Sequence, residues 1–210
     1  IDDLRLGYSI IGSESILYEK INPLDPNSIN LKYKDHTREG VNYTNFSFIS
    51  EKKDSDVIII QKGNHKLENS VYFPSNKRVY IYENTSIDLV DSAIIFSKSP
   101  FYMYGTEEHP INLYSSDYTG EGIILVSASK KSVIEHVNFF NFAFQADISW
   151  GKTGAVTFYE SPVSIKSCSF YGNNSEDALN IIRTNFIIQN TIFSKNKHDA
   201  FDADFSDGII

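Results

Sequence analysis

The sequence is poor in the residues that mark several classes of protein. Its 210 residues include one cysteine, one tryptophan, one methionine and six prolines. The single cysteine, Cys168, excludes a disulfide within the chain and indicates no redox compartment. A membrane span needs about 18 consecutive apolar residues, whereas the longest apolar runs, such as Val57–Ile60, have the length of a strand. The sequence therefore predicts no membrane span.

Positive charge is also scarce. The chain has 19 Lys and Arg residues against 27 Asp and Glu, and its net charge is −8. Because phosphate backbones are bound by a basic face, we expect no nucleic-acid partner. No signal peptide is visible, yet the chain begins with Ile1 rather than Met. This start predicts a processed or excised piece of a longer protein.

Strand-forming and turn-forming residues make up much of the rest. The chain has 15 Phe and 13 Tyr, together with many Ile, Ser and Asn residues. Aromatic and β-branched residues favour strands, and Asn and Ser favour turns. No convincing stretch has apolar residues at the i, i+3, i+4 and i+7 spacing of an amphipathic helix. The composition predicts an all-β protein.

A repeat occupies the C-terminal half of the chain. One phrase of the form I-x-x-x-x-F recurs at residues 134–139, 165–170 and 188–193. A second column begins at Gly122, Gly154, Asp177 and Asp199, in steps of 32, 23 and 22 residues. The last two steps have the length of one solenoid coil, and the first contains about nine extra residues, best placed around Phe144–Lys152.

Each coil divides into three short strands with alternating apolar residues. In the clearest coil these are Ala178–Ile182, Phe186–Ile188 and Thr191–Phe193. The alternation slips by one at Gln189–Asn190, which predicts a tight turn with Asn190 in the left-handed region. Strands of successive coils should then stack into parallel sheets, since one coil alone cannot bury its apolar face.

These phrases, with the Asp177–Ile181 phrase D-A-L-N-I, resemble the repeat of the pectin-lyase-like superfamily. The resemblance implies a right-handed, single-stranded parallel β-helix with coils of about 22–23 residues, which we assign to residues 53–210. Residues 1–52 do not join the repeat and predict a small N-terminal β cap or hairpin with a turn near Arg38–Gly40. The linker is placed at Ser50–Asp56. The helix stops in mid-coil at Ile210, so we expect further C-terminal coils of the same parent chain as its neighbours.

Stacking predicts which polar side chains of the last two coils meet. Asp177 should lie under Asp199, Asn180 under Asp202 and Ile182 under Asp204, with Asn180, Asp202 and Asp204 facing outward. Several carboxylates within reach suit calcium or acid–base chemistry. The predicted metal ligands are Asp199, Asp202 and Asp204, with Ca²⁺ as the possible cofactor, and the candidate catalytic residues are Asp202, Asp204, His198 and Arg183.

A structural interpretation competes with each of these sites. Aspartate at a turn often hydrogen-bonds nearby backbone, which would explain Asp177 and Asp199. Trp150, on the inserted loop, could stack on a sugar or cover a sheet. The predicted ligand-binding residues are Trp150, Asn180 and Asp202. Further residues are interpreted structurally: the Glu107–His109 segment as a turn between coils, His136 as a turn residue and Cys168 as a core residue.

In the superfamily that the repeat resembles, enzymes act on acidic polysaccharides at the outer face of one parallel sheet. The resemblance therefore implies an extracellular or cell-envelope protein that binds or processes polysaccharide. Were it an enzyme, it would be a polysaccharide lyase, an epimerase or a glycoside hydrolase. The G-H-G phrase of polygalacturonases is absent from the sequence, which counts against a pectin hydrolase. The alternative is a noncatalytic scaffold or surface-adhesion segment, because a fold does not determine a function.

Overall fold

The computed structural model describes residues 4–22, 35–143 and 154–210 of the chain. These residues form two compact units, Ile1–Lys34 and Asp35–Ile210. The first unit contains an antiparallel hairpin of β1 (Arg5–Tyr8) and β2 (Leu17–Lys20), in which Arg5 pairs with Lys20 and Tyr8 with Leu17. Among the described residues, no helix has the length and apolar character of a membrane span.

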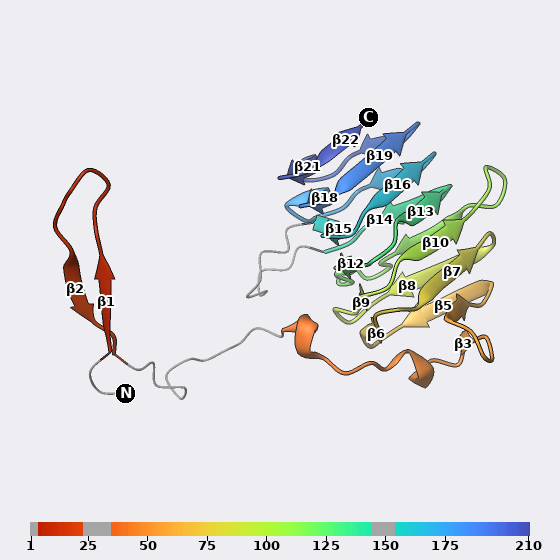
Figure 1. Ribbon diagram of the computed structural model, residues 1–210. Helices are drawn as coiled ribbons and strands as arrows, with labels where there is room; N and C mark the ends of the chain where they lie inside the picture. Colours follow the sequence, from red (N-terminus) through yellow and green to blue (C-terminus); the bar gives the residue numbers. More distant parts are fainter. Residues whose placement is uncertain (1–3, 23–34, 144–153) are drawn as a thin grey trace. The chain divides into compact units, whose positions relative to one another are not determined.

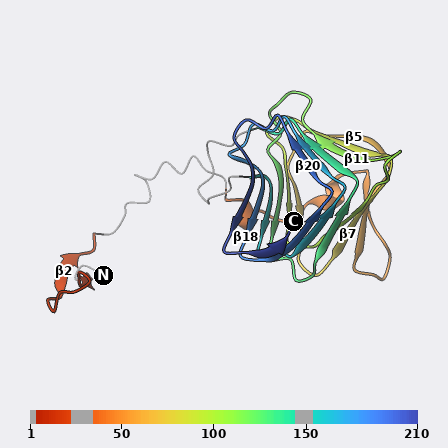
Figure 2. The ribbon, with the colours of Figure 1, turned by 90° about the horizontal axis from the view of Figure 1, so that it is seen from above.

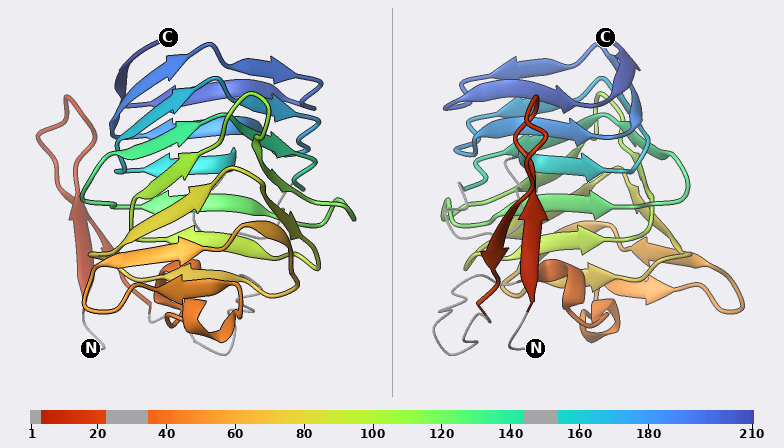
Figure 3. Two further views of the ribbon diagram at one scale, coloured as in Figure 1. Left: turned by 90° about the vertical axis from the view of Figure 1, so that its right-hand side faces the viewer. Right: turned by 60° about the vertical axis from the view of Figure 1, so that its left-hand side comes forward.

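The second unit is a parallel β-solenoid of about six coils, roughly 23 residues apart (Figure 1). The coils advance in a right-handed sense (Figure 2), and Figure 3 shows the stack from two further sides. The all-β parallel helix predicted from the repeat is thus confirmed. Each coil contributes one strand to each of three sheets, because three turns per coil change the direction of the chain.

The three sheets have the following strands. Sheet 1 contains β3 (Ile49–Glu51), β4 (Val57–Ile60), β7 (Arg78–Tyr82), β10 (Phe101–Tyr104), β13 (Ser132–Glu135), β16 (Val163–Lys166), β19 (Asn185–Gln189) and β22 (Asp207–Ile209). Sheet 2 contains β5 (Gly63–Leu67), β8 (Thr85–Leu89), β11 (Ile111–Tyr114), β14 (Val137–Phe140), β17 (Ser169–Tyr171) and β20 (Ile192–Ser194). Sheet 3 contains β6 (Val71–Phe73), β9 (Ile94–Ser97), β12 (Gly122–Val126), β15 (Gly154–Tyr159), β18 (Asp177–Ile182) and β21 (Asp199–Asp204).

Inward-facing residues form ladders along the solenoid axis. Phe139, Phe170 and Phe193 stack on one another with ring centroids 4.9 Å apart. Burying such rings between coils adds to the apolar contact of the aliphatic core, since each coil covers the next. The turn from sheet 1 to sheet 2 is also repeated: His136, Ser167 and Asn190 have φ values of 50°, 53° and 48°. The predicted left-handed turn at Asn190 and the turn role of His136 are confirmed.

The segment that precedes the first coil differs from the prediction. Instead of a hairpin near Arg38–Gly40, two 3₁₀ turns form, η1 (His36–Arg38) and η2 (Tyr43–Asn45). The predicted linker at Ser50–Asp56 begins inside β3, which pairs antiparallel with β4. Residues 35–51 belong to the solenoid unit because Tyr43 stacks on Phe73 at 5.8 Å and donates a 2.6 Å hydrogen bond to Glu51. This segment caps the core at the first coil.

Candidate functional site

The predicted register of the last two coils is correct. Asp177 pairs with Asp199, Asn180 with Asp202 and Ile182 with Asp204. The surroundings of these residues differ from the expectation, however, because Asn180 is only 2% exposed although it points away from the core. Its amide nitrogen donates a 2.9 Å hydrogen bond to Asp177, which is itself buried. Asn180, predicted to bind a ligand, is therefore closed to solvent.

Two of the other predicted site residues contact each other, since Arg183 N–H donates a 2.8 Å hydrogen bond to the Asp204 carbonyl oxygen. Asp202 accepts a 2.8 Å hydrogen bond from the neighbouring Ala203 N–H, and Asp204 is exposed. Arg183 donates to the Tyr159 hydroxyl at 3.1 Å, and its guanidinium lies 5.9 Å from the Phe205 ring centre. His198 and Asp199 are exposed chain neighbours, and Trp150 lies outside the described residues.

Within residues 4–22, 35–143 and 154–210, no three His, Cys, Asp or Glu side chains form a group that could hold a metal ion. Asp199, Asp202 and Asp204 are among these residues. Calcium binding by these three aspartates stays a prediction, and their side chains do not form a ready-made group of ligands.

The outer face of sheet 3, where the predicted site lies, is largely buried in the earlier coils. Its outward residues form a second apolar cluster made of Tyr72, Ile94, Phe96, Ile124 and Val126. At the first coils the cover is His36, whose ring stacks on Tyr72 at 5.9 Å and on Phe96 at 6.4 Å. His36 Nδ1 also shares a 2.8 Å hydrogen bond with the Tyr72 hydroxyl. This face is therefore closed where a long polymer would need an open surface.

Sheet 2 has a different outer face. Two columns of side chains run side by side across β11, β14 and β17, and we call them the sheet 2 strip: Asn112, Asn138 and Ser169 in one column, and Tyr114, Phe140 and Tyr171 in the other. Asn138 donates a 3.0 Å hydrogen bond to Asn112, and the rings of Tyr114 and Phe140 stack at 4.9 Å and 5°. Tyr171 is 41% exposed. The strip thus presents aromatic rings beside amide and hydroxyl groups.

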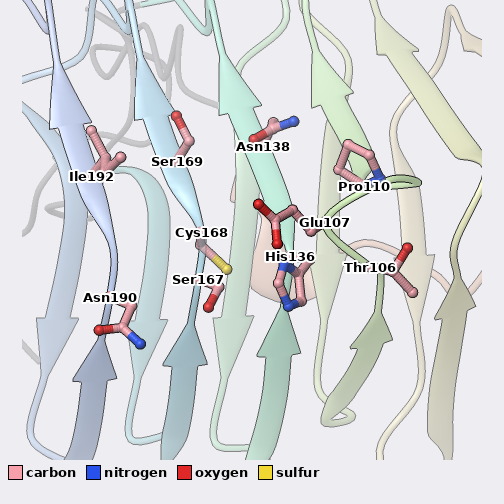
Figure 4. A pocket seen from close by; sticks show the side chains of 10 residues that line it. All are labelled: Thr106, Glu107, Pro110, His136, Asn138, Ser167, Cys168, Ser169, Asn190 and Ile192. Atoms are coloured by element: carbon pink, nitrogen blue, oxygen red, sulfur yellow. The ribbon is translucent and has the colours of Figure 1, made fainter.

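A cleft of about 390 Å³ adjoins the strip at the turn between sheets 1 and 2. Figure 4 shows its walls: the turn residues His136, Ser167 and Asn190 of successive coils, the strip residues Asn138 and Ser169, and the connection between β10 and β11. Its ten lining residues are Thr106, Glu107, Pro110, His136, Asn138, Ser167, Cys168, Ser169, Asn190 and Ile192. Most are neutral and polar, so the cleft offers several hydrogen-bonding groups in a small volume.

The connection that closes one end of the cleft joins two strands of one coil, β10 and β11, rather than successive coils as predicted. Gly105 begins it, and a Cβ atom there would lie 2.3 Å from the His136 carbonyl oxygen. Only glycine allows this close approach of two backbones. Gly105 N–H donates to the Glu135 carbonyl at 2.9 Å, which fixes the start of the connection beside the next coil.

Cys168 also contacts the cleft, but its thiol belongs to the core. It is 3% exposed, and burial raises its pKa to about 12. Since the thiolate is the nucleophilic form, this thiol is unsuited to catalysis at neutral pH. The prediction of Cys168 as a buried core residue is confirmed.

A second aromatic group lies on the outer face of sheet 1, on β7 and β10. It consists of Tyr80, Tyr82, Tyr102 and Tyr104, and Tyr80 and Tyr102 stack at 4.9 Å. Arg78 beside them donates to both carboxylate oxygens of Asp56, at 3.0 and 2.5 Å. The sequence interpretation missed both aromatic groups, although aromatic residues at outward positions of aligned strands were their signal.

Comparison of the chain with protein-family models, with curated proteins and with solved structures gives no match in any of the three. The function is therefore argued from the strip and the cleft.

Proposed function

We propose that this solenoid binds a polysaccharide along the sheet 2 strip, with the cleft holding part of the same ligand. The observation that carries the proposal is the aromatic column Tyr114, Phe140 and Tyr171 directly beside the polar column Asn112, Asn138 and Ser169. Sugar rings present C–H faces that pack on aromatic rings, and hydroxyls that bond amides and hydroxyls. The two columns match these two parts of a sugar.

The direction of the columns supports a polymer rather than a single sugar. Neighbouring strands of a sheet are about 4.8 Å apart, and the columns cross β11, β14 and β17 in register. A ligand that contacts all three strands must extend along the solenoid axis. An extended glycan chain has this shape.

Binding without turnover is the better-supported form of this proposal. Hydrolysis of a glycosidic bond by the common mechanisms needs two carboxyl groups that flank the bond. Glu107 is the only carboxylate among the ten described residues that line the cleft. A lyase or epimerase would need a base together with a cation that neutralises a uronate, and the lining residues include no Lys or Arg.

The coil length and the three strands per coil also support placing the chain in the pectin-lyase-like superfamily, as part of the same proposal. An extracellular or cell-envelope location would follow from a polysaccharide ligand. The scaffold or surface-adhesion alternative uses the same regular coils and differs in that it predicts no glycan binding.

The test is retardation of the protein in native gels that contain soluble polysaccharides from a broad panel. Combined Phe140→Ala and Tyr171→Ala substitution should weaken binding tenfold or more, because each ring contributes about 1 kcal/mol and tenfold is about 1.4 kcal/mol. Tyr118→Ala is the matched control, since Tyr118 is 66% exposed and belongs to the loop between β11 and β12 rather than to the strip. Absence of binding across the panel, or equal loss in the Tyr118 variant, would contradict the proposal.

A further inference from the structure

The charge around the sheet 2 strip narrows the class of polysaccharide. From β11 to β20, the outward residues of sheet 2 contain no ionisable acid or base other than the tyrosine hydroxyls. They are Asn112, Tyr114, Asn138, Phe140, Ser169, Tyr171, Ile192 and Ser194. In a chain of which 22% of residues are charged, this face is built from neutral groups.

Two of the lysines near this face contact neighbouring groups. Lys195 Nζ donates to the Tyr171 hydroxyl at 3.2 Å and lies 5.3 Å from the centre of that ring. Lys66 forms a 3.0 Å ion pair with Glu68. A uronate or sulfate would have to compete with Glu68 for Lys66, and Lys195 lies only at the Tyr171 end of the strip.

Carboxylates border the same face. Glu107 lines the cleft, and Asp88 is in register with Tyr114 and accepts two hydrogen bonds from Ser116, at 2.8 and 2.7 Å. A polyanion would meet these like charges and would lose water from its own carboxylates without gaining a charged partner along β11 and β14. An uncharged glycan loses no ionic hydration when it packs on the aromatic column.

We infer that the polysaccharide bound by the sheet 2 strip and the cleft is uncharged, an inference that rests on the proposed function. It departs from the acidic polymers that the repeat resemblance implies. A neutral chain of hexose or pentose units satisfies both columns of the strip. A uronate polymer would find no cation among the outward residues of β11, β14 and β17.

The test compares a neutral glucan with the same glucan oxidised at C6 to the uronate, so that only the charge differs. Neutral glucans whose linkages leave the C6 hydroxyl free are first screened, and the one that binds most tightly is oxidised to make the matched pair. The assays are run at pH 8, because ordinary histidine side chains are mostly neutral there. We expect the oxidised polymer to bind at least tenfold more weakly than its neutral parent.

Two variants sharpen the result. Ser169→Lys places a cation within the strip and should improve binding of the oxidised polymer severalfold, whereas Ser164→Lys, on the outer face of sheet 1, should not. Equal or tighter binding of the oxidised polymer by the unmodified protein would overturn the inference and leave the proposed function standing. Binding of neither polymer class would overturn both.

Discussion

The outer faces of sheet 2 and sheet 3 come from the same coils and yet differ in kind. On sheet 3, Phe96 and Ile124 point outward and are only 3% and 4% exposed. On sheet 2, Phe140 and Tyr171 occupy outward positions and remain partly open to solvent. Strand alternation therefore determines where a side chain points, whereas its exposure depends on what packs over the sheet. A polymer can bind only to a face that stays open to solvent.

The strongest test of this difference uses two phenylalanines that both point away from the core. Phe96→Ala should destabilise the solenoid by about 3–5 kcal/mol, since it removes a buried ring that packs on His36 and Tyr72. Phe140→Ala should cost only about 1–2 kcal/mol, because that ring is partly exposed and loses one stacked neighbour. Urea unfolding followed by far-ultraviolet circular dichroism measures both.

Equal costs for the two alanine variants would show that the two faces are covered alike. Long repeat arrays depart from two-state unfolding, so the midpoints are compared as well as the fitted free energies. The proposed glycan binding should give the reverse order: we expect Phe140→Ala to weaken it and Phe96→Ala, as long as the variant is folded, to leave it unchanged.

A smaller effect is expected from removing one hydroxyl on each face. Tyr72→Phe breaks the 2.8 Å hydrogen bond with His36 in a buried setting and should cost about 1–2 kcal/mol. Tyr114→Phe should cost less than about 0.5 kcal/mol, because its hydroxyl has no hydrogen bond to the residues that the structure describes. Thermal melting of the two variants beside the unmodified protein distinguishes the values. A larger loss for Tyr114→Phe would mean that the strip hydroxyl has a structural partner.

The fold was predictable from the sequence because its causes are local and repeated. Alternation in Ala178–Ile182 fixes the buried side of a strand, and the parity slip at Asn190 locates a left-handed turn, as the structure shows. Recurrence of the same phrase 22 or 23 residues later then gives the register between coils. None of these steps needs knowledge of distant contacts.

The site was not predictable in the same way. Asn180 was expected to be accessible because it faces outward, and no rule of alternation could show that it is buried. The cover of Phe96 comes from His36, which lies 60 residues earlier in the chain. The aromatic column could be predicted from the sequence, since Tyr114, Phe140 and Tyr171 end the aligned strands β11, β14 and β17. The carboxylates of Asp199, Asp202 and Asp204 indicate a site on sheet 3 instead.

The segment between β11 and β12 connects the open face to the closed one, and Asp117 holds it. The Asp117 carboxylate accepts hydrogen bonds from Thr119 N–H at 2.9 Å, Ser115 Oγ at 2.9 Å and Asp91 N–H at 3.2 Å. Desolvation by itself would raise the pKa of this carboxyl, but these bonds to the charged form outweigh it and lower the pKa to about 2.

The smallest expected effect is the pH dependence of this connection. A carboxyl whose pKa is lower in the folded than in the unfolded chain stabilises the fold above its ordinary pKa of 3.8 and stops doing so as the pH falls through about 2. The melting temperature of Asp117→Asn should therefore lie below that of the unmodified protein at pH 7, and the gap should shrink between pH 4 and pH 2. Asp54→Asn, in the exposed turn between β3 and β4, is the control. A gap that stays constant down to pH 2 would mean that the connection is held by the shape of its turn rather than by the charge of Asp117.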